Sequence, residues 1–321
     1  TLSNWLRPGD YLRDIAKSAS EKSLVDVNPT LATAGKKIEW AKALAGHVPS
    51  SVVQPFADNA VIAVVLLSLL AGLALRKTSR EFPKEFAPVE NVIEVLHRVV
   101  EHIITLVVKL VPIAVFSVVA KTVGEHGLAP LKGLAVYLGV CLLGLFLQAA
   151  LVYQSWIVFV ARTGFIRFWT HAREAVTYAL GASSSLATLP VTLRGLDQLG
   201  VTRESSRLAA CVGTNLNNDG ILLYEALAAL LVAQAYGIEL SYLEQIGVAI
   251  SCVIAGIGIA GVPEAGLISL ALVLATAGLP LELLPVLLSV DWVLSRARAA
   301  TNVLADFTVA LLLDRWNQKN S

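Results

Sequence analysis

The sequence predicts an all-α, polytopic membrane protein, and three observations predict it. Hydrophobic residues make up 56% of the 321 residues and charged residues only 15%, whereas soluble domains are about 45–50% apolar and about 25% charged. Several apolar runs have close to the roughly 20 residues that a helix needs to cross a bilayer. These runs lack the alternation with period two that a membrane-spanning β-structure requires.

Charge and cysteine usage exclude other classes. The formal net charge is +1, so nothing in the composition favours a nucleic-acid partner. Cys141, Cys211 and Cys252 lie in apolar segments without paired spacing, so we expect small core residues rather than disulfides or a zinc site. The chain contains no methionine and opens on a polar stretch without a signal peptide. We therefore expect a fragment that lacks N-terminal helices.

The elements follow from the apolar runs, in chain order. Residues 1–50 are polar and predict a surface connection with short helices. Residues 51–75 predict the first span, and residues 92–123, with an apolar run at 103–120, predict a second helix. The polar residues of this second helix recur at helical spacing and should share one face: Glu94, Arg98, Glu101, His102 and Lys109. The run at 131–160 predicts a long third span.

Shorter apolar runs at 221–235, 246–259 and 267–277 predict half-spans. Two segments read as helix, small-residue tip, helix: 165–199 around GASSSLATLP and 242–278 around AGIGIAGVPEAG. Arginine and lysine gather in alternate loops, which the positive-inside rule places in the cytoplasm together with the C-terminus. The number of crossings places all the basic loops in the cytoplasm only if each of these two segments enters and leaves the membrane on the same side. We therefore expect two re-entrant hairpins whose tips line a cavity.

The last apolar helix carries charge along one stripe. Five polar residues step by 4, 3, 4 and 4, which places them on one helix face: Asp291, Ser295, Arg298, Asn302 and Asp306. A charge at the bilayer centre costs about 2.5–3.5 kcal/mol on insertion scales. An Asp–Arg pair that holds helices together is one interpretation. A path for solute or ions is the favoured one, because Arg298 suits a carboxylate and Asn302 and Asp306 suit a small cation.

A second interruption lies in GTNLNNDGILLYEA, residues 213–226. Asn215, Asn217, Asn218 and Asp219 break an apolar span, and these residue types favour turns. A simple kink is the alternative to a broken helix, whose freed carbonyls build ion and substrate sites in carriers.

The two hairpin tips suit the same purpose. Ser183 to Ser185 offer hydroxyl and N–H groups at a helix start, which attracts anions. Gly256, Gly258 and Gly261 permit close backbone approach, and no βαβ unit surrounds them, which excludes a dinucleotide fold. The two tips are expected to meet at one site and act as gates.

Four motifs in this order resemble those of the sodium-coupled dicarboxylate and excitatory amino-acid transporters, the glutamate transporter homologues: SSSLATLP, NNDG, AGVPEAG and DWVLSRARAATNVLAD. The resemblance implies a homotrimer with a scaffold part (1–127) and an elevator-type transport domain (128–321). The latter would contain a helix, the first hairpin (165–199), a broken helix (203–235), the second hairpin (242–278) and the last helix (281–315). It also implies that about three N-terminal helices are missing.

The resemblance also implies roles for individual residues. Arg298 matches the arginine that binds a substrate carboxylate, Asn302 contacts the substrate, and the first and second hairpin tips clamp the other carboxylate through Ser184, Ser185, Gly261 and Val262. Sodium would be held at a first site by Asp306 with Gly213 and Asn217, at a second by Asp219, and at a third by carbonyls around Ile257 and Ile259. Further candidate ion-site residues are Asn215, Asn218 and Asn302.

Departures from the family pattern concern the substrate. Amino-acid carriers place an aspartate where Ser295 stands and a threonine where Ala299 stands, and a buried ammonium without a counter-charge is poorly compensated. The sequence therefore predicts symport of a dicarboxylate without an amino group, such as succinate, malate or fumarate. Ile221 replaces a threonine and Asn218 a methionine, while the retained Asp306 favours Na⁺ as coupling ion, with H⁺ as an alternative.

Four other functions were weighed. A symporter of acidic or neutral amino acids and an anion channel are the alternatives within the transporter class. An intramembrane aspartyl protease using Asp219 and Asp306 lacks the G-x-G-D pattern, and a serine hydrolase built on GASSS lacks G-x-S-x-G. We therefore expect no enzyme, and a multi-pass protein of the plasma (inner) membrane whose partners are a small anionic solute and the lipid bilayer.

Overall fold

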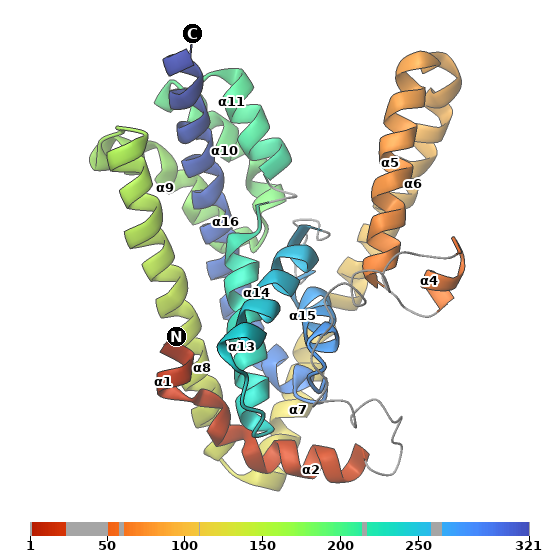
Figure 1. The fold of residues 1–321 in the computed structure, drawn as a ribbon, viewed down its shortest axis with the longest axis vertical. Helices are drawn as coiled ribbons and strands as arrows, with labels where there is room; N and C mark the ends of the chain where they lie inside the picture. Colours follow the sequence, from red (N-terminus) through yellow and green to blue (C-terminus); the bar gives the residue numbers. More distant parts are fainter. Residues whose placement is uncertain are drawn as a thin grey trace. The chain divides into compact units, whose positions relative to one another are not determined.

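A computed structural model of the chain describes residues 2–23, 51–57, 61–108, 110–213, 217–257 and 265–320. Within these ranges the protein is built of helices and contains no β-strand, which confirms the all-α prediction (Figure 1). The chain divides into two compact units, one formed by residues 1–28 with 115–321 and the other by 29–114. The predicted division into scaffold and transport parts concerns motion and stays a prediction.

The unit of residues 29–114 contains α4 (Gln54–Ala57), α5 (Val61–Glu81) and α6 (Pro83–Val108). The predicted bounds 51–75 and 92–123 are wrong here. The helix α5 continues through a charged, helix-compatible segment, and α6 begins with Pro83 at the first helical position, where a proline N–H is not needed. A new helix, α7 (Val111–His126), begins with a proline at its second position. Arg98 pairs with Glu94 one turn away, as their spacing predicted.

The N-terminal residues form α1 (Leu2–Leu6), the 3₁₀ helix η1 (Pro8–Leu12) and α2 (Arg13–Ser23). The prediction of a surface connection is wrong for this segment. Leu12 is fully buried, and a Cβ on Gly9 would lie 2.3 Å from the carbonyl oxygen of Leu231. Gln234 accepts a hydrogen bond from the Gly9 N–H at 3.2 Å and donates one to the Ser3 carbonyl at 3.0 Å. The segment therefore packs against the C-terminal end of α13 although most of its residues are polar.

The predicted long span is α8 (Ala129–Leu147), which continues through the π-helical turns η3 (Gln148–Tyr153) and η4 (Trp156–Val160). Among the described residues, Pro130–Val160 is the one helix whose length and apolarity suit a membrane crossing, and Tyr242–Gly256 is a shorter apolar helix. The multi-pass arrangement therefore stays a prediction for the other runs.

The predicted first hairpin consists of α9 (Phe165–Ala182) and α10 (Ser185–Leu199), which pack side by side. At its tip Ser183 adopts the left-handed conformation, with φ at 54°, and Ser184 caps α10 by accepting the Ala187 N–H at 3.1 Å. The helix–tip–helix prediction is confirmed, and its re-entry into a membrane stays a proposal.

The remaining helices surround the last one. The broken helix is α11 (Arg203–Arg207), the π-helical η5 (Leu208–Val212) and α13 (Asp219–Ala235). The predicted second hairpin supplies α14 (Tyr242–Ile257) and α15 (Ala265–Thr276). The last helix, α16, spans Leu284–Asn320, so it begins three residues later and ends five residues later than predicted.

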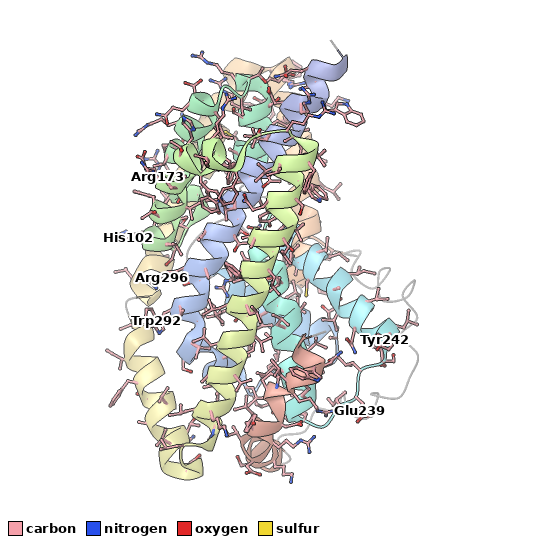
Figure 2. The ribbon with its side chains drawn as sticks, turned by 90° about the vertical axis from the view of Figure 1, so that its left-hand side faces the viewer. His102, Arg173, Glu239, Tyr242, Trp292 and Arg296 are labelled. Atoms are coloured by element: carbon pink, nitrogen blue, oxygen red, sulfur yellow. The ribbon has the colours of Figure 1, made fainter. Side chains whose placement is uncertain are left out.

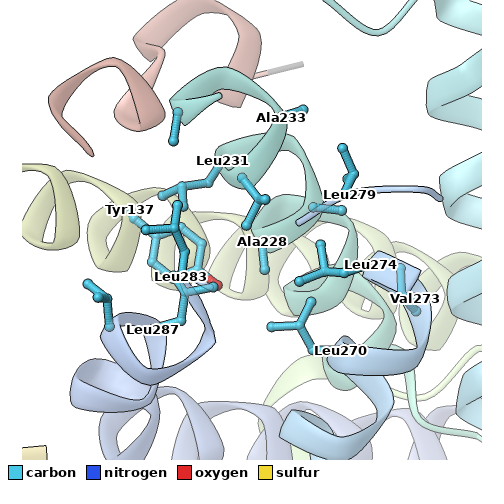
Figure 3. Packing of buried hydrophobic residues seen from close by; sticks show 14 of the residues in the cluster. Tyr137, Ala228, Leu231, Ala233, Leu270, Val273, Leu274, Leu279, Leu283 and Leu287 are labelled. Atoms are coloured by element: carbon cyan, nitrogen blue, oxygen red, sulfur yellow. The ribbon is translucent and has the colours of Figure 1, made fainter. Parts of the chain in front are cut away.

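Two hydrophobic cores lie along α16 and position the site. The first joins its N-terminal half to α8, α13 and α15, with Tyr137, Leu231, Leu274 and Leu287 packed together (Figure 3). The second joins its C-terminal half to α9 and α10 around Phe307, and a Cβ on Gly195 would lie 2.8 Å from the Phe307 ring. The polar stripe of α16 lies where these cores meet.

Candidate functional site

The polar stripe of α16 is buried along its whole length. Exposure is at most 8% for each of its members, Asp291, Ser295, Arg298, Asn302 and Asp306, which confirms that they share one inward face. Arg296 lies on the outer face, donates a hydrogen bond to the Trp292 carbonyl and stacks 5.3 Å from the centre of the exposed Trp292 ring (Figure 2). The same helix therefore carries one buried arginine and one surface arginine.

Asp291 and Arg298 form a buried, two-pronged ion pair within α16. The guanidinium donates hydrogen bonds to the two carboxylate oxygens at 2.7 and 3.2 Å, and the exposed fractions of the two side chains are 4% and 2%. The Asp–Arg alternative from the sequence is thus present, but within one helix rather than between helices. In this conformation the guanidinium of Arg298 is engaged by a carboxylate of the protein itself.

Two other elements enclose the guanidinium of Arg298. Its central carbon lies 4.1 Å from the ring centre of Tyr224 on α13, a cation–π contact. On another side, a Cβ on Gly266, in the first turn of α15, would lie 3.1 Å from the guanidinium. The second hairpin therefore begins its return helix directly against the buried charge.

Asn218 links three elements at the start of α13. Its amide donates to the Gly256 carbonyl on α14 at 3.0 Å, and its oxygen accepts from the Asn302 amide on α16 at 3.3 Å. Asn302 in turn accepts the Gly220 N–H at 2.8 Å. Asn218 is only 1% exposed, so it makes a buried polar crosslink that needs both the donor and the acceptor of its amide group.

Gly220 permits this close approach of α13 to α16. A Cβ there would lie 2.7 Å from the carbonyl oxygen and 2.9 Å from the Cα of Arg298. We expect Gly220→Ala to destabilise the protein by about 1–3 kcal/mol through overpacking and to displace Asn302. Gly139→Ala is the matched control, because no atom lies within 4 Å of its Cβ and alanine is the better helix former. Thermal unfolding of both purified variants checks this, and equal melting temperatures would contradict it.

Asp306 faces the interruption between η5 and α13. The Asn217 amide donates to its carboxylate at 3.3 Å, and a Cβ on Gly213 would lie 2.7 Å from the same oxygen. Asp306 is 1% exposed. The structure thus brings together the three residues of the first predicted ion site, with oxygen atoms that suit a hard cation.

Asp219, the second predicted ion ligand, lies at the N-terminus of α13. Its carboxylate accepts a hydrogen bond from the Tyr153 hydroxyl at 2.8 Å. Tyr153 ends the π-helical turn η3, and η5 precedes the interruption in the broken helix. Since π-helical turns occur frequently at functional sites, the positions of η3 and η5 next to Asp219 and the helix interruption are consistent with a functional region here.

The other predicted substrate residues have different surroundings. Ser295 donates to the Trp292 carbonyl of its own helix at 3.2 Å, and Ala299 and Ile221 are buried at 5% and 8% exposure. Ser184 and Ser185 are buried at the first hairpin tip.

Four predicted residues lie outside what the structure describes. Asn215, Ile259, Gly261 and Val262 belong to segments beyond the described residues, and Ile257 ends α14 as its last residue. Their predicted roles stay predictions.

Sequence reasoning missed three buried polar residues near the site: Tyr153, Tyr224 and Glu225. Glu225 is fully buried one residue beyond Tyr224, lies beside Ser269 and within electrostatic reach of Arg298, and makes no hydrogen bond of ordinary length with the described residues. The signal was present, since an acid in an apolar run such as 221–235 is costly and usually functional.

No disulfide and no cluster of metal-binding side chains occurs among the described residues. Cys141 and Cys252 are buried and Cys211 is exposed, and each is present as a thiol rather than in a disulfide. Within the described ranges, no three His, Cys, Asp or Glu side chains gather as a transition-metal site would require.

Paired helices and an interrupted helix around buried charge are the arrangement of membrane carriers. The sequence profile of the sodium:dicarboxylate symporter family matches residues 1–316. The chain belongs to this family of transporters, which are not enzymes.

Relatives within the family fall into two groups. The chain is similar to excitatory amino acid transporter 4 of Mus musculus, with 35% identity over 227 residues, 70% of this chain and 40% of the relative. It is similar to a C4-dicarboxylate transport protein of Cupriavidus necator, with 31% identity over 277 residues, 85% of this chain and 62% of the relative. The chain thus spans between two fifths and two thirds of the length of these relatives.

Proposed function

We propose that the protein is a secondary active, Na⁺-coupled symporter of a small dicarboxylate without an amino group, such as succinate, malate or fumarate. One observation carries the substrate class. Around Arg298 the stripe supplies a serine at 295, the residue that follows the arginine is Ala299, and the acid of the stripe at 291 is already paired with the arginine. A solute ammonium would then lack a free carboxylate partner within the stripe, whereas a solute carboxylate can exchange with Asp291 on the guanidinium.

The cation sites complete the proposal. Na⁺ binds where Asp306 faces Gly213 and Asn217, and a second ion binds at Asp219. Solute and cation lie along the same buried stripe, so the charge of each lowers the free energy that is needed to bind the other. The binding of the two is therefore coupled, and each raises the affinity for the other by the same factor. We further propose the elevator motion, the homotrimer, the two re-entrant hairpins and a cytoplasmic C-terminus in the inner membrane.

The test is uptake by the complete protein in proteoliposomes under an inward Na⁺ gradient, with labelled succinate and labelled L-aspartate compared. Succinate uptake that excess aspartate does not inhibit is expected. Tight aspartate uptake would overturn the substrate class and favour the amino-acid symporter, the function named for the excitatory amino acid transporters. Uptake of either solute without Na⁺ dependence would overturn the proposal that Na⁺ is the coupling ion.

A paired substitution sharpens the substrate test. Ser295→Asp with Ala299→Thr supplies the two groups that the amino-acid carriers place there. We expect succinate uptake to fall and aspartate inhibition to appear, because the new carboxylate repels the dianion and pairs with an ammonium. Inhibition constants for aspartate and succinate measure the switch. Ala299→Thr alone is the control and should leave the preference for succinate in place.

A further inference from the structure

At the end of the first hairpin, lined by none of the residues of the proposed transport site, the structure forms a small polar cavity of about 200 Å³. It lies between the end of η4, the two ends of the α9–α10 hairpin and the C-terminal part of α16. Its lining includes three arginines, Arg162, Arg167 and Arg315, and one acid, Asp314. Its volume is below the roughly 300 Å³ of the smallest pockets for drug-sized ligands, so it suits a single small group.

The acid of this cavity is already engaged. One oxygen of Asp314 accepts the Thr202 N–H at 2.9 Å and the Thr202 hydroxyl at 2.7 Å. The other accepts the Gln318 amide at 2.7 Å. The carboxylate thus holds Thr202, the N-cap residue of α11, and Gln318, and it pairs with none of the arginines in the described part of the chain.

The arginines are left with spare hydrogen-bond donors. Arg167 donates one bond to the Leu199 carbonyl at 2.9 Å, and neither Arg162 nor Arg315 has an ion pair or side-chain hydrogen bond to the described residues. Three positive charges against one engaged carboxylate leave a net positive cavity. Guanidinium groups pair with phosphate through two parallel hydrogen bonds, so their convergence suits a phosphate group.

The backbone at Arg162 supports this interpretation. The Thr163 N–H bonds to the Ile157 carbonyl at 2.9 Å, which closes the helix C-terminus, and Arg162 adopts the left-handed conformation with φ at 56°. Glycine usually occupies this position because it has no Cβ to strain. Here an arginine does, and its side chain lines the cavity.

The surroundings are apolar and aromatic. Phe159, Phe165 and Trp316 are 78%, 55% and 70% exposed beside the cavity-lining segments. Tryptophan is enriched at the level of lipid headgroups in membrane proteins, as Trp316 would be here, and basic pockets between helices at that level bind phosphorylated headgroups.

We propose that this cavity is a binding site for a phosphate group, contributed by an anionic phospholipid headgroup or by a soluble phosphate compound. Because the lining joins both ends of the α9–α10 hairpin to α16, the bound group would hold the base of the hairpin against the last helix. The site is separate from the proposed solute and cation sites and does not depend on them.

The test compares ligand retention by the wild type and by Arg162→Gln/Arg315→Gln. Arg167 stays unchanged because it also ties the hairpin ends together. Native mass spectrometry counts phosphatidylglycerol and phosphatidylcholine bound to the detergent-solubilised protein, and thermal unfolding is followed during titration with inorganic phosphate. Arg207→Gln, an exposed arginine of α11 outside the cavity, is the matched control.

We expect the double variant to bind phosphatidylglycerol about 25-fold more weakly, since each basic residue near an anionic headgroup contributes roughly fivefold. Stabilisation of the wild type by inorganic phosphate as well would identify a soluble phosphate compound, and its absence would identify the lipid headgroup. If the double variant and Arg207→Gln bind phosphatidylglycerol and phosphate as the wild type does, the proposal is overturned.

Discussion

Arg298→Met is expected to lower the free energy of unfolding by about 3–5 kcal/mol, the cost of leaving one partner of a buried ion pair without the other. Asp291 would then remain 2% exposed without its two hydrogen bonds. Solute uptake is expected to fall to background. Chemical denaturation and proteoliposome uptake measure the two effects.

A second variant separates stability from transport. Asp291→Leu/Arg298→Met removes both charges, and replacement of a whole buried pair by apolar residues is often neutral. We expect the double variant to regain most of the lost stability but no uptake. If it transported succinate, the pair would be a structural brace and Arg298 would not bind the solute.

The surface arginine of the same helix is the control. Arg296→Gln removes an equal charge two residues away, where the side chain lies on the outer face against Trp292. Surface substitutions usually change stability by less than about 0.5 kcal/mol. We therefore expect unchanged stability and uptake, and a loss comparable to that of Arg298→Met would argue against a specific role for the buried arginine.

Asp306→Asn is expected to abolish most of the stabilisation by Na⁺ while the protein still folds. An asparagine oxygen can still accept the hydrogen bond that Asn217 donates to Asp306, so the fold keeps its local contact. A cation loses a full counter-charge in a buried site, where charges interact more strongly than in water. We expect the Na⁺ concentration for half-maximal stabilisation to rise at least about tenfold. This rise corresponds to a loss of about 1.4 kcal/mol or more in the free energy of Na⁺ binding.

The measurement is the melting temperature as a function of NaCl concentration, with choline chloride keeping the ionic strength constant. A ligand at 100 times its dissociation constant stabilises a protein by about 2.7 kcal/mol, so the wild-type shift is measurable. Thr308→Val, a buried polar residue of the same helix whose hydroxyl bonds to the Leu304 carbonyl, should keep the Na⁺ response. An undiminished Na⁺ response in Asp306→Asn would remove this residue from the ion site.

The elements that sequence reasoning placed well are those with strong local signals. The tip of the first hairpin follows from three consecutive serines, and one of them caps α10. The interruption before α13 follows from asparagine and aspartate in an apolar run. Helix bounds were predicted less well, because helix-compatible charged residues extend α5 past the apolar run that marks a membrane span.

The contacts that sequence reasoning missed are long-range. The polar N-terminal segment looks like a surface connection until Gly9 is found against the backbone of α13, more than 200 residues away. Asn218 was predicted as part of the helix interruption and as an ion-site candidate, but its bonds to Gly256 and Asn302 cross 38 and 84 residues of chain. No local pattern encodes such contacts.

By itself, the sequence determined the helical class, the family and the single stripe that carries Asp291, Arg298 and Asp306, because a helix repeats every 3.6 residues whatever surrounds it. Only the tertiary structure decided that Asp291 pairs with Arg298, that Tyr224 and the start of α15 enclose the guanidinium, and that three arginines converge at the hairpin base. These arrangements depend on which distant segments exclude water from a given charge, and that is a property of packing rather than of spacing along the chain.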